Sequence, residues 1–377
     1  MATNNNNKAL NVPHLRFPEF SGEWKMATFG DIAKGFDYGM NAAAKSFDGN
    51  NKYIRITDID EVSSQYLYDD VVSPDGELED RYLVKENDIL LARTGASTGK
   101  SYLYRNSDGK LYFAGFLIRA NIYKHNSYFV FSQLHTLRYK KWISVMSARS
   151  GQPGINSQEY ASFPVYTTSL QEEDKIATFL KLLDERIITQ NKIIYKLKSL
   201  IRGIAQNMVH RGKPNVRLSD CMICNSSTLQ ESEVLESGTY PVYGANGIVG
   251  YLDCYATLNE AIYIIKDGSG VGTVFYVAGK CSAAGTLNTL QAKEGYSLQY
   301  LYYLLTVFNF EPYKTGMAIP HIYFKDYGKA KVFCPSHSEQ FKYTKLLSTI
   351  DSKLLAEQNA LVNYNLQKQY LLRQMFI

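Results

Sequence analysis

The sequence predicts an α+β protein that contains the same module twice, each module being a β-rich segment followed by a long helix. The first observation behind this prediction is a pair of helix-start signals, Ser169-Leu-Gln-Glu172 and Ser336-His-Ser-Glu339, which lie 167 positions apart. Each matches the S-x-x-E capping box, in which the two side chains satisfy two backbone N–H groups at a helix start. The second observation is a heptad pattern of apolar residues after each box, repeated at the same spacing.

The duplication divides the chain into five segments. An N-terminal tail and opening segment covers residues 1–23, and a first β-rich domain covers residues 24–168. A first long helix then covers 169–209, a second β-rich domain 210–335, and a second long helix 336–377. A chain of 377 residues with 45% hydrophobic content is long enough to bury two or three cores.

Strand signals dominate both β-rich domains, because runs of β-branched and aromatic residues alternate with glycine-containing turns. The predicted strands of the first domain are 53–56, 88–93, 101–104 and 116–118, and those of the second domain are 261–266 and 274–277. A short helix is predicted after the strands of each domain, at 128–138 in the first and at 298–308 in the second.

The two long helices each carry a seam of side chains spaced alternately by four and three residues, which is the pattern of a coiled coil. The first seam contains Ile176, Leu180, Leu183, Ile187, Gln190, Ile194 and Leu197, and the second contains Leu347, Ile350, Leu354, Glu357 and Leu361. We predict that the helices pair as an antiparallel coiled coil, with Gln190 facing Leu361 and Glu357 facing Ile194. Two polar residues in the middle of the pair then fix its register. The alternative is that each helix packs on a globular core instead.

Antiparallel pairing has a consequence for the two β-rich domains. Each domain ends only a few residues before its long helix, so the pairing places the domains at opposite ends of a rod. A rod of about 40 residues is about 60 Å long at 1.5 Å per residue. Its two-fold axis is perpendicular to the rod, as in duplex DNA, so it suits two half-sites separated along the duplex.

A glycine-rich turn follows a strand in each domain and is preceded by a basic residue. Arg93-Thr-Gly-Ala-Ser-Thr-Gly99 in the first domain aligns with Lys266-Asp-Gly-Ser-Gly-Val-Gly272 in the second. Glycine permits a positive φ and a close approach of the backbone to a partner. The basic side chain suits a phosphate or the edge of a guanine. The alternative interpretation is an ordinary hairpin turn with an exposed cation.

Other chemistry is poorly supported by the sequence. The run from Thr94 to Ser101 differs from the motif of a phosphate-binding loop at one position, since Thr94 stands where the motif has glycine. Such a loop must also open a helix, whereas a strand is predicted here. The carboxylates of Asp75 and Asp108 with Lys110 resemble a metal nuclease only loosely. Cys221-x-x-Cys224 lacks the second pair of ligands of a zinc site. No H-E-x-x-H motif is present, and no G-x-G-x-x-G opens a helix.

Composition sets wider bounds. The net charge of +5 permits a nucleic-acid partner without requiring one. Five cysteines are few and odd in number, which argues against a disulfide scaffold. The first residues lack the apolar stretch of a signal peptide, and no run approaches eighteen apolar residues. We therefore expect a cytoplasmic protein without a membrane span.

Several motifs resemble the specificity (S) subunits of type I restriction-modification systems. The opening Leu15-Arg-Phe-Pro-Glu-Phe20, followed by Trp24 and Gly30-Asp-Ile32, is similar to the start of those chains. The run from Tyr240 to Tyr251, YPVYGANGIVGY, resembles a phrase of their recognition domains. The two S-x-x-E helices resemble their spacer regions. The resemblance covers nearly the whole chain.

This resemblance implies two target recognition domains, each reading one half of a bipartite site in double-stranded DNA. The helices would set the spacing and dock two methyltransferase (M) subunits, which bind S-adenosylmethionine. Separate restriction or motor (R) subunits would use ATP and Mg. The chain itself would be non-catalytic and would bind no cofactor or metal. The alternatives are a stand-alone two-domain nucleic-acid-binding regulator, a structural adaptor for proteins, and an enzyme that uses the loose carboxylate pattern.

We expect DNA contacts from the glycine-rich turns and from neighbouring loops, some to phosphates and some to base edges. The candidates in the first domain are Arg93, Thr94, Ser97, Lys100, Arg105, Arg149 and Gln152. The candidates in the second domain are Tyr243, Asn246, Lys266, Ser269, Lys314 and His321. For each of them, a solvated surface residue is the alternative.

Overall fold

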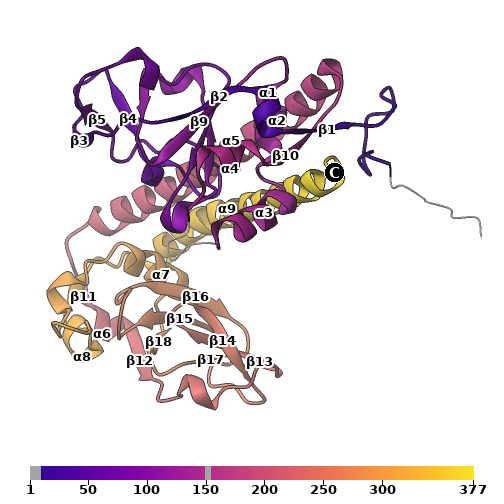
Figure 1. Ribbon diagram of the computed structural model, residues 1–377. Helices are drawn as coiled ribbons and strands as arrows, with labels where there is room; N and C mark the ends of the chain where they lie inside the picture. The colour runs from indigo at the N-terminus through magenta and orange to yellow at the C-terminus, as the bar shows by residue number, and fades with distance from the viewer. Residues whose placement is uncertain (1–9, 149–153) are drawn as a thin grey trace, which may run out of the picture. The chain divides into compact units, whose positions relative to one another are not determined.

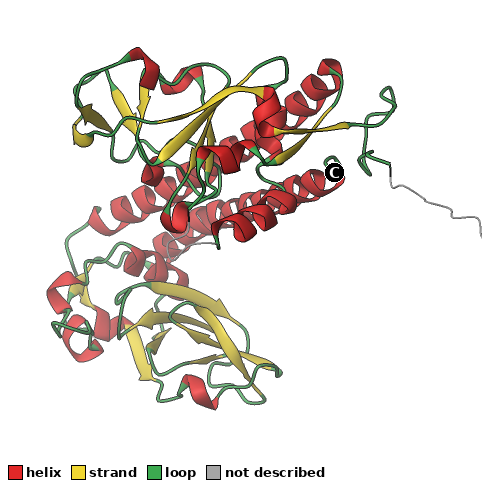
Figure 2. Cartoon of the chain, in the orientation of Figure 1, coloured by secondary structure: helices red, strands yellow, loops and turns green. Residues whose placement is uncertain are grey.

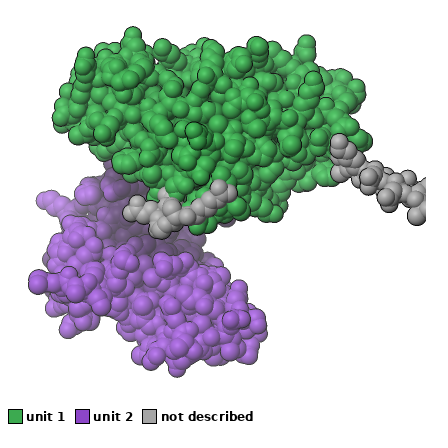
Figure 3. Space-filling view, viewed as in Figure 1, with its two compact units in different colours: residues 1–189, 361–377 green, residues 190–360 purple. Residues whose placement is uncertain are grey.

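The computed structural model describes residues 10–148 and 154–377, which divide into two compact units (Figure 3). Unit 1 consists of residues 1–189 and 361–377, and unit 2 consists of residues 190–360. The boundaries between the units cut both long helices. Each unit therefore contains one β-rich domain together with one segment of each long helix.

Unit 1 alternates short strands with short helices before the first long helix begins (Figures 1 and 2). Its strands are β1 (Lys25–Thr28), β2 (Ala33–Tyr38), β3 (Ala43–Ser46), β4 (Lys52–Ile54), β5 (Val72–Asp75), β6 (Asp88–Ala92), β7 (Ser101–Leu103), β8 (Leu111–Phe113), β9 (Leu117–Ile122) and β10 (Pro164–Thr167). Its helices are α1 (Phe29–Ile32), α2 (Ser127–Gln133), α3 (Leu137–Ser147), α4 (Ser157–Ala161) and the first half of α5 (Leu170–His210).

Unit 2 likewise combines short strands and short helices before the second long helix. Its strands are β11 (Val216–Arg217), β12 (Met222–Ser226), β13 (Tyr240–Gly244), β14 (Gly247–Leu252), β15 (Glu260–Ile265), β16 (Val274–Ala278), β17 (Ser282–Ala283), β18 (Leu287–Ala292) and β19 (Lys331–Val332). Its helices are α6 (Leu218–Cys221), α7 (Leu298–Thr306), α8 (Phe324–Tyr327) and most of α9 (His337–Gln374).

Both units are built on the same four-stranded antiparallel sheet, which confirms the predicted α+β duplication. The strand order is β2-β9-β6-β7 in unit 1 and β12-β18-β15-β16 in unit 2. Each glycine-rich turn joins the last two strands of its sheet, β6 to β7 and β15 to β16. In each unit the first and last strands also form an antiparallel pair, β1-β10 or β11-β19. The other strands differ, because unit 1 adds the pairs β3-β5 and β4-β8, whereas unit 2 adds the sheet β14-β13-β17.

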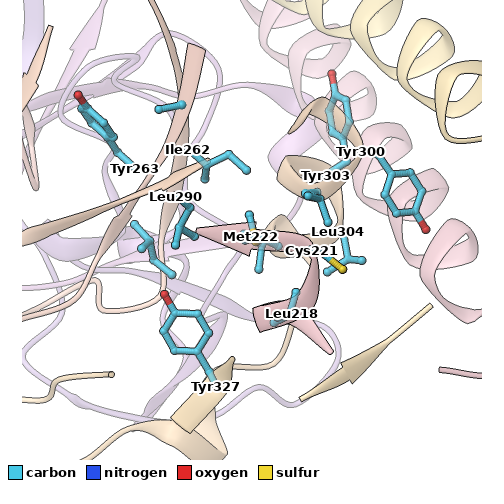
Figure 4. Packing of buried hydrophobic residues seen from close by; sticks show 14 of the residues in the cluster. Leu218, Cys221, Met222, Ile262, Tyr263, Leu290, Tyr300, Tyr303, Leu304 and Tyr327 are labelled. Carbon is cyan, nitrogen blue, oxygen red and sulfur yellow. The ribbon is translucent and has the colours of Figure 1, made fainter. Parts of the chain in front are cut away.

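The hydrophobic core of each unit is shared between its sheet and the long helices. Figure 4 shows part of the core of unit 2, where side chains from the strands gather against helices α6 and α7. The buried residues in this cluster include Met222, Ile262, Leu290 and Leu304, and Leu347 of α9 joins them. Burying one such side chain contributes about 1.5–3 kcal/mol. The sheet is consequently held in place by the helix that follows it.

The two long helices pair antiparallel within each unit, as the sequence predicts. In unit 1 the Lys368 Nζ lies 2.6 Å from an Asp184 carboxylate oxygen. In unit 2, just after the end of α5, the Arg211 guanidinium donates to the Tyr343 hydroxyl at 2.6 Å. Late residues of α5 thus contact early residues of α9, and early residues of α5 contact late residues of α9.

The residues of the predicted seam face inward. Ile176, Leu180, Leu183, Gln190, Ile194 and Leu347 are buried, and Ile187, Leu197, Ile350, Leu354, Glu357 and Leu361 are half-buried. The predicted register of the helix pair is wrong by one helical turn, since Gln190 contacts Glu357 and not Leu361, the partner predicted for it. Its amide donates to the Glu357 carboxylate and, at 2.9 Å, to the Glu357 backbone oxygen. Direct pairing is favoured because it satisfies both polar groups at once.

Replacing Gln190 and Glu357 together by leucine should raise the melting temperature of the chain by about 2–4 °C, since apolar layers stabilise a coiled coil more than polar ones. The helices should lose register specificity at the same time. Thermal unfolding followed by circular dichroism measures the first effect. Gln190→Leu alone should lower the melting temperature, because it leaves Glu357 without this donor. A double variant that melts at or below the wild-type temperature would contradict the assigned role.

The ends of two predicted elements need correction. Helix α5 begins beside Ser169 and α9 beside Ser336, but neither forms the predicted reciprocal capping box. The Ser169 hydroxyl accepts the N–H of Glu172 at 3.3 Å, whereas the Glu172 carboxylate is taken by other donors. The Ser336 hydroxyl donates to the Glu339 side chain at 3.1 Å.

Two short elements also differ from prediction. The helix predicted at 128–138 is broken into α2 and α3, because Thr136 ends one helix and caps the next. The Thr136 hydroxyl donates to the Gln133 oxygen at 2.7 Å and accepts the N–H of Tyr139. The strand predicted at 53–56 ends at Ile54, because a 3₁₀ turn begins at Ile56.

In each unit, the helix that follows the sheet is fastened to a long helix by a tyrosine. The Tyr128 hydroxyl of α2 donates to Asp184 of α5, and the Tyr303 hydroxyl of α7 donates to Asp351 of α9. The two aspartates occupy equivalent positions in the repeat. Burial and the neighbouring carboxylate raise the pKa of both tyrosines, so both hydroxyls keep their proton at neutral pH.

The opening segment of unit 1 packs on the end of α9. The Leu15 N–H donates to the backbone oxygen of Gln374 at 2.8 Å. The Phe376 ring lies 6.1 Å from the Trp24 ring and 5.3 Å from the Phe129 ring, centroid to centroid. Both aromatic partners are buried. The last residues of the sequence therefore complete a core that is otherwise built from its first half.

Among residues 10–148 and 154–377, no helix combines the length and apolar character that crossing a membrane requires.

Candidate nucleic-acid interface

The glycine-rich turn of unit 1 is closed by the backbone of the strands it joins. The Ala92 N–H donates to the Lys100 oxygen at 2.8 Å, and the Gly99 N–H donates to the Ala92 oxygen at 3.1 Å. Gly99 has φ of +91°, and a Cβ there would lie 2.9 Å from the Ile143 side chain. Tyr160 stabilises the turn, since its hydroxyl donates to the Ala92 oxygen at 2.6 Å.

The turn of unit 2 has the same hydrogen bonds. The Ile265 N–H donates to the Thr273 oxygen at 2.9 Å, and the Gly272 N–H donates to the Ile265 oxygen at 2.9 Å. Gly272 has φ of +92°, as Gly99 has +91° in the first copy. The predicted alignment of the two turns is therefore reproduced in their backbone geometry.

A second loop lies against each turn, and the contact is again the same in both units. In unit 1 the Ile155 N–H donates to the Arg93 oxygen at 2.9 Å. In unit 2 the Ile322 N–H donates to the Lys266 oxygen at 2.9 Å. These second loops immediately precede α4 and α8. Each unit thus presents a turn and a loop held together at the first residue of the turn.

The surface around the turn of unit 1 is aromatic and basic. The Arg93 guanidinium lies 4.8 Å from the centre of the Tyr38 ring, and the Arg93 N–H donates to the Phe116 oxygen at 3.1 Å. The Phe116 side chain is 60% exposed. Hydrogen bonding to the Ser157 side chain lowers the pKa of Tyr38, and the Ser157 N–H and the positive charge of Arg93 act in the same direction. A stacked guanidinium beside an exposed ring suits phosphates and bases alike.

The surface around the turn of unit 2 carries three of the predicted residues. The Lys266 Nζ donates to the Ser227 oxygen at 3.3 Å and is half-buried. The Lys314 Nζ is 2.6 Å from a carboxylate oxygen of Glu311. His321 pairs with the turn at Asp267 through a β-bridge, and its ring packs edge-on against Tyr323. Lys266 and His321 are therefore neighbours, and Lys314 lies on the same loop as His321.

The remaining turn residues are placed as follows. Thr94 is half-buried and forms a β-bridge with Gly154, whereas Ser269 is exposed. Ser97 lies in a 3₁₀ turn at the tip and is half-buried. The Lys100 Nζ lies 3.8 Å from a Glu61 carboxylate oxygen. The turn consequently contributes Thr94, Ser97 and Lys100 to one surface of unit 1.

Other predicted residues lie away from the turns. Arg105 lines a hollow of about 650 Å³ that faces α5, together with Tyr128 and Asp184. Tyr243 and Asn246 lie on the separate β13–β14 hairpin, where Tyr243 packs edge-on against Tyr263 and Asn246 is exposed. Two further candidates, Arg149 and Gln152, lie outside the described residues.

The catalytic patterns that the sequence discounted are structural features. Ser101 opens strand β7 rather than a helix. The Asp108 carboxylate is buried and accepts the hydroxyls of Tyr68 and Tyr102, each at 2.6 Å. The buried Cys221 thiol donates to the Arg217 oxygen at 3.2 Å. In the described part of the chain, no group of three or more His, Cys, Asp or Glu is arranged to hold a metal ion.

Comparison with known proteins identifies the family. The type I restriction modification DNA specificity domain matches the chain twice, over residues 21–199 and 214–364. The chain belongs to this family. The two matches correspond to the two repeats, so each unit carries one specificity domain.

Individual relatives agree with this assignment. Over 98 residues the chain is 31% identical to a Haemophilus influenzae chain named as a type I restriction enzyme specificity subunit. Over 117 residues it is 26% identical to the EcoprrI specificity subunit of Escherichia coli. These matches cover 25% and 31% of this chain, and they span only 26% and 29% of the two relatives.

Solved structures share the fold of the specificity domains. The S subunit of a type I system from M. genitalium superposes with a TM-score of 0.67 at 17% identity, covering 97% of this chain and 99% of that one. A chain from a structure of the type I R-M system gives a TM-score of 0.53 at 14% identity, covering 94% and 96%. The duplicated architecture is therefore common to all three chains.

Sequence reasoning missed several exposed side chains beside the turns of these specificity domains. They are Tyr38 and Phe116 in unit 1 and Met317 and Ile319 in unit 2. The two aromatic residues are far from Arg93 in sequence, so only the sheet register brings them together. Met317 and Ile319 could have been found from the sequence, since Met317-Ala-Ile-Pro320 is an apolar run inside a loop.

Proposed function

We propose that this chain is the DNA specificity subunit of a type I restriction-modification complex, in which unit 1 reads one half of a bipartite site and unit 2 reads the other. The observation that carries the proposal is the repeated pairing of a glycine-rich turn with a second loop. A pair of equivalent surfaces on one chain suits a target with two separate halves.

The chemistry of these surfaces supports DNA as the partner. Arg93 and Lys266 occupy the same position in the two turns. Cationic side chains at such positions bind phosphates or donate hydrogen bonds to the O6 and N7 atoms of guanine. Each turn leads into a strand, β7 or β16, rather than into a helix whose N-terminus could hold a phosphate as a phosphate-binding loop does. This arrangement suits contacts to DNA from the turn itself.

The proposal extends to partners. Two methyltransferase subunits would dock on α5 and α9 and would bring S-adenosylmethionine for adenine methylation. Restriction or motor subunits would bring ATP and Mg. Helix α5 has 41 residues and would span about 60 Å, which is long enough to set the distance between two half-sites. This chain would supply the sequence specificity and no bond-making step.

A genome-wide map of methylated adenine tests the proposal directly. The map is made in the native host with the gene intact, deleted, and restored on a plasmid. Deletion should abolish methylation of one split motif, two short specified halves around an unspecified gap, and restoration should return it. An unchanged map in cells that express the gene would reject the proposal.

Lys266→Ala provides a finer test of unit 2. If Lys266 contacts a phosphate, the variant should bind every sequence more weakly, and the slope of log affinity against log salt should fall by about one. If it contacts guanine, one position of the motif should relax, at a cost of about 1–3 kcal/mol. Filter binding by the assembled complex at several salt concentrations distinguishes these outcomes.

Lys293→Ala is the matched control. Its Nζ also donates to a backbone oxygen, that of Ser219 at 2.8 Å, but Lys293 follows the far end of β18 from the glycine-rich turn. This control should bind DNA like the wild type. Equal behaviour of the two lysine variants would remove Lys266 from the interface.

A further inference from the structure

The second loop of unit 2 forms a closed hairpin that is hydrogen-bonded to the glycine-rich turn. At its base the Thr315 N–H donates to the His321 oxygen at 2.9 Å, and the His321 N–H donates to the Thr315 oxygen at 2.8 Å. A third bond, from the Gly268 N–H to the Pro320 oxygen at 2.9 Å, fastens the hairpin to the turn. The position of its tip relative to Lys266 is therefore defined by the backbone.

The hairpin depends on glycine at its first tip position. Gly316 has φ of +88°, and a Cβ there would lie 2.3 Å from the Ile319 oxygen. No other residue type fits that conformation and that contact. The tight bend turns the following side chains outward instead of folding them back on the domain.

The tip consists of apolar residues, Met317-Ala-Ile-Pro320. Met317 is 106% exposed and Ile319 is 65% exposed, so both side chains point into solvent. Exposing side chains of this size to water is unfavourable relative to burying them. Ordinary turns use Asn, Asp, Ser and Gly at such positions. An apolar tip held rigidly in water indicates a surface that is covered when a partner binds.

The surroundings of the tip identify the kind of partner. Lys266, Lys314 and His321 lie at the base of the hairpin, where Lys314 pairs with Glu311 and His321 lies opposite Asp267. Lys325 follows at the start of α8. Cations flanking an apolar point suit duplex DNA, where phosphates border a groove floor made of bases. A protein or membrane partner would favour a broader apolar face than two side chains on one hairpin.

We propose that Met317 is a specificity-determining residue of unit 2, which contacts the 5-methyl group of a thymine in the major groove, with Ile319 packing beside it. This inference rests on the proposed function and names one base that the second half-site must contain. Thymine is the base that offers an apolar group in the major groove, and apolar side chains are its usual partners. Methionine suits this role because its unbranched thioether adapts to the shape of the surface it meets.

The test uses the complete complex of this chain with its methyltransferase partners and the motif obtained from the methylation map. In duplexes of that motif, each thymine of either half is replaced in turn by deoxyuridine, which keeps every hydrogen-bonding group and lacks only the methyl group. The half in which Met317→Ala removes the effect of a replacement is the half that unit 2 reads. One replacement should weaken binding by the wild type about fourfold, the value of one methyl group.

Met317→Ala should bind the thymine duplex about fourfold more weakly than the wild type and should no longer distinguish thymine from deoxyuridine at that position. The variant should fold normally, because the side chain is fully exposed. Leu258→Ala is the matched control, since Leu258 is 53% exposed but lies before the opposite end of β15. It should keep the wild-type preference for thymine.

Three outcomes would overturn the inference. The half read by unit 2 contains no A·T pair, no deoxyuridine replacement changes the affinity, or Met317→Ala retains the full preference for thymine. Weaker binding by Met317→Ala without any effect of deoxyuridine would indicate a wedge between base steps instead. Each of these leaves the proposed function intact, whereas an unchanged methylation map after deletion of the gene rejects the proposed function itself.

Discussion

Replacing Arg16 by alanine should lower the free energy of unfolding of unit 1 by about 3–5 kcal/mol, because it leaves a buried carboxylate without its counter-ion. The Arg16 guanidinium binds both oxygens of Glu172, each at 2.7 Å, and the Glu172 side chain is only 1% exposed. The variant would retain only the Trp24 indole N–H at 3.3 Å and the Thr168 hydroxyl at 2.6 Å as donors to Glu172. Denaturant unfolding followed by hydrogen exchange of residues 10–148 measures the loss.

Two controls separate this effect from a general loss of surface charge. Arg81→Ala removes an exposed arginine that pairs with Glu79 at 2.9 Å, and it should leave the stability unchanged. The double variant Arg16→Ala with Glu172→Gln should recover part of the loss, since a neutral amide is easier to bury than a carboxylate. Equal stability of Arg16→Ala and Arg81→Ala would contradict the prediction.

The same ion pair predicts a pH dependence. Burial opposes ionisation of Glu172, but the hydrogen bonds from Arg16, Thr168 and Trp24 outweigh it and lower the pKa of the carboxyl group. A lowered carboxyl pKa contributes stability above its unfolded value, and this contribution is lost as the pH falls through the folded value. In Arg16→Ala the carboxylate is neutralised more easily, so the difference in stability between wild type and variant should shrink in acid.

Leu347→Ala should destabilise unit 2 by about 2–5 kcal/mol, because it opens a cavity where α9 packs on the sheet. Leu347 is fully buried in the same cluster as Tyr300 and Leu304 of α7. Hydrogen exchange within residues 190–360 should accelerate, and denaturant unfolding of the variant measures the loss of stability.

Leu346→Ala is a control at the adjacent position. Leu346 is 50% exposed, and its truncation should change the free energy of unfolding by no more than about 0.5 kcal/mol. Similar effects of the two substitutions would show that the heptad seam is not the packed face of α9.

The long helices and the four-stranded sheets could be predicted from sequence because their signals are local and repeated. The apolar spacing from Ile176 onward specifies one face of a helix, and the duplication provides an independent second reading of each element. The break between α2 and α3 was missed because apolar periodicity continues across it. The decisive group there is the Thr136 hydroxyl, which serves two helices at once.

Partners that are distant in sequence were beyond prediction. Glu172 fits a capping box by spacing, yet its carboxylate is recruited by Arg16, 156 positions earlier. Gln190 and Glu357 were both recognised as polar positions of the seam, but a shift of one turn decides whether they meet. Periodicity defines which face of a helix is buried, whereas the register depends on the few polar contacts that side chains complete.

The candidate interface was predicted in part. Arg93 and Lys266 stood out because a basic residue before a glycine-rich turn recurs in both halves. Arg105 remains a prediction, and the structure places it in a hollow facing α5 rather than beside the turn. Tyr38 and Phe116 reach Arg93 only through the pairing of β2, β9 and β6, which sequence spacing does not reveal.

The packing of Phe376 against Trp24 and Phe129 bears on how the chain is made. A ribosome delivers residues 190–360 before it delivers residues 371–377, so unit 2 has its whole sequence available while unit 1 still lacks part of its core. Unit 1, although translated first, is completed last. A prematurely terminated product would leave Trp24 and Phe129 uncovered and open to chaperones and proteases. Only chains that include residues 371–376 would then have the complete core of unit 1.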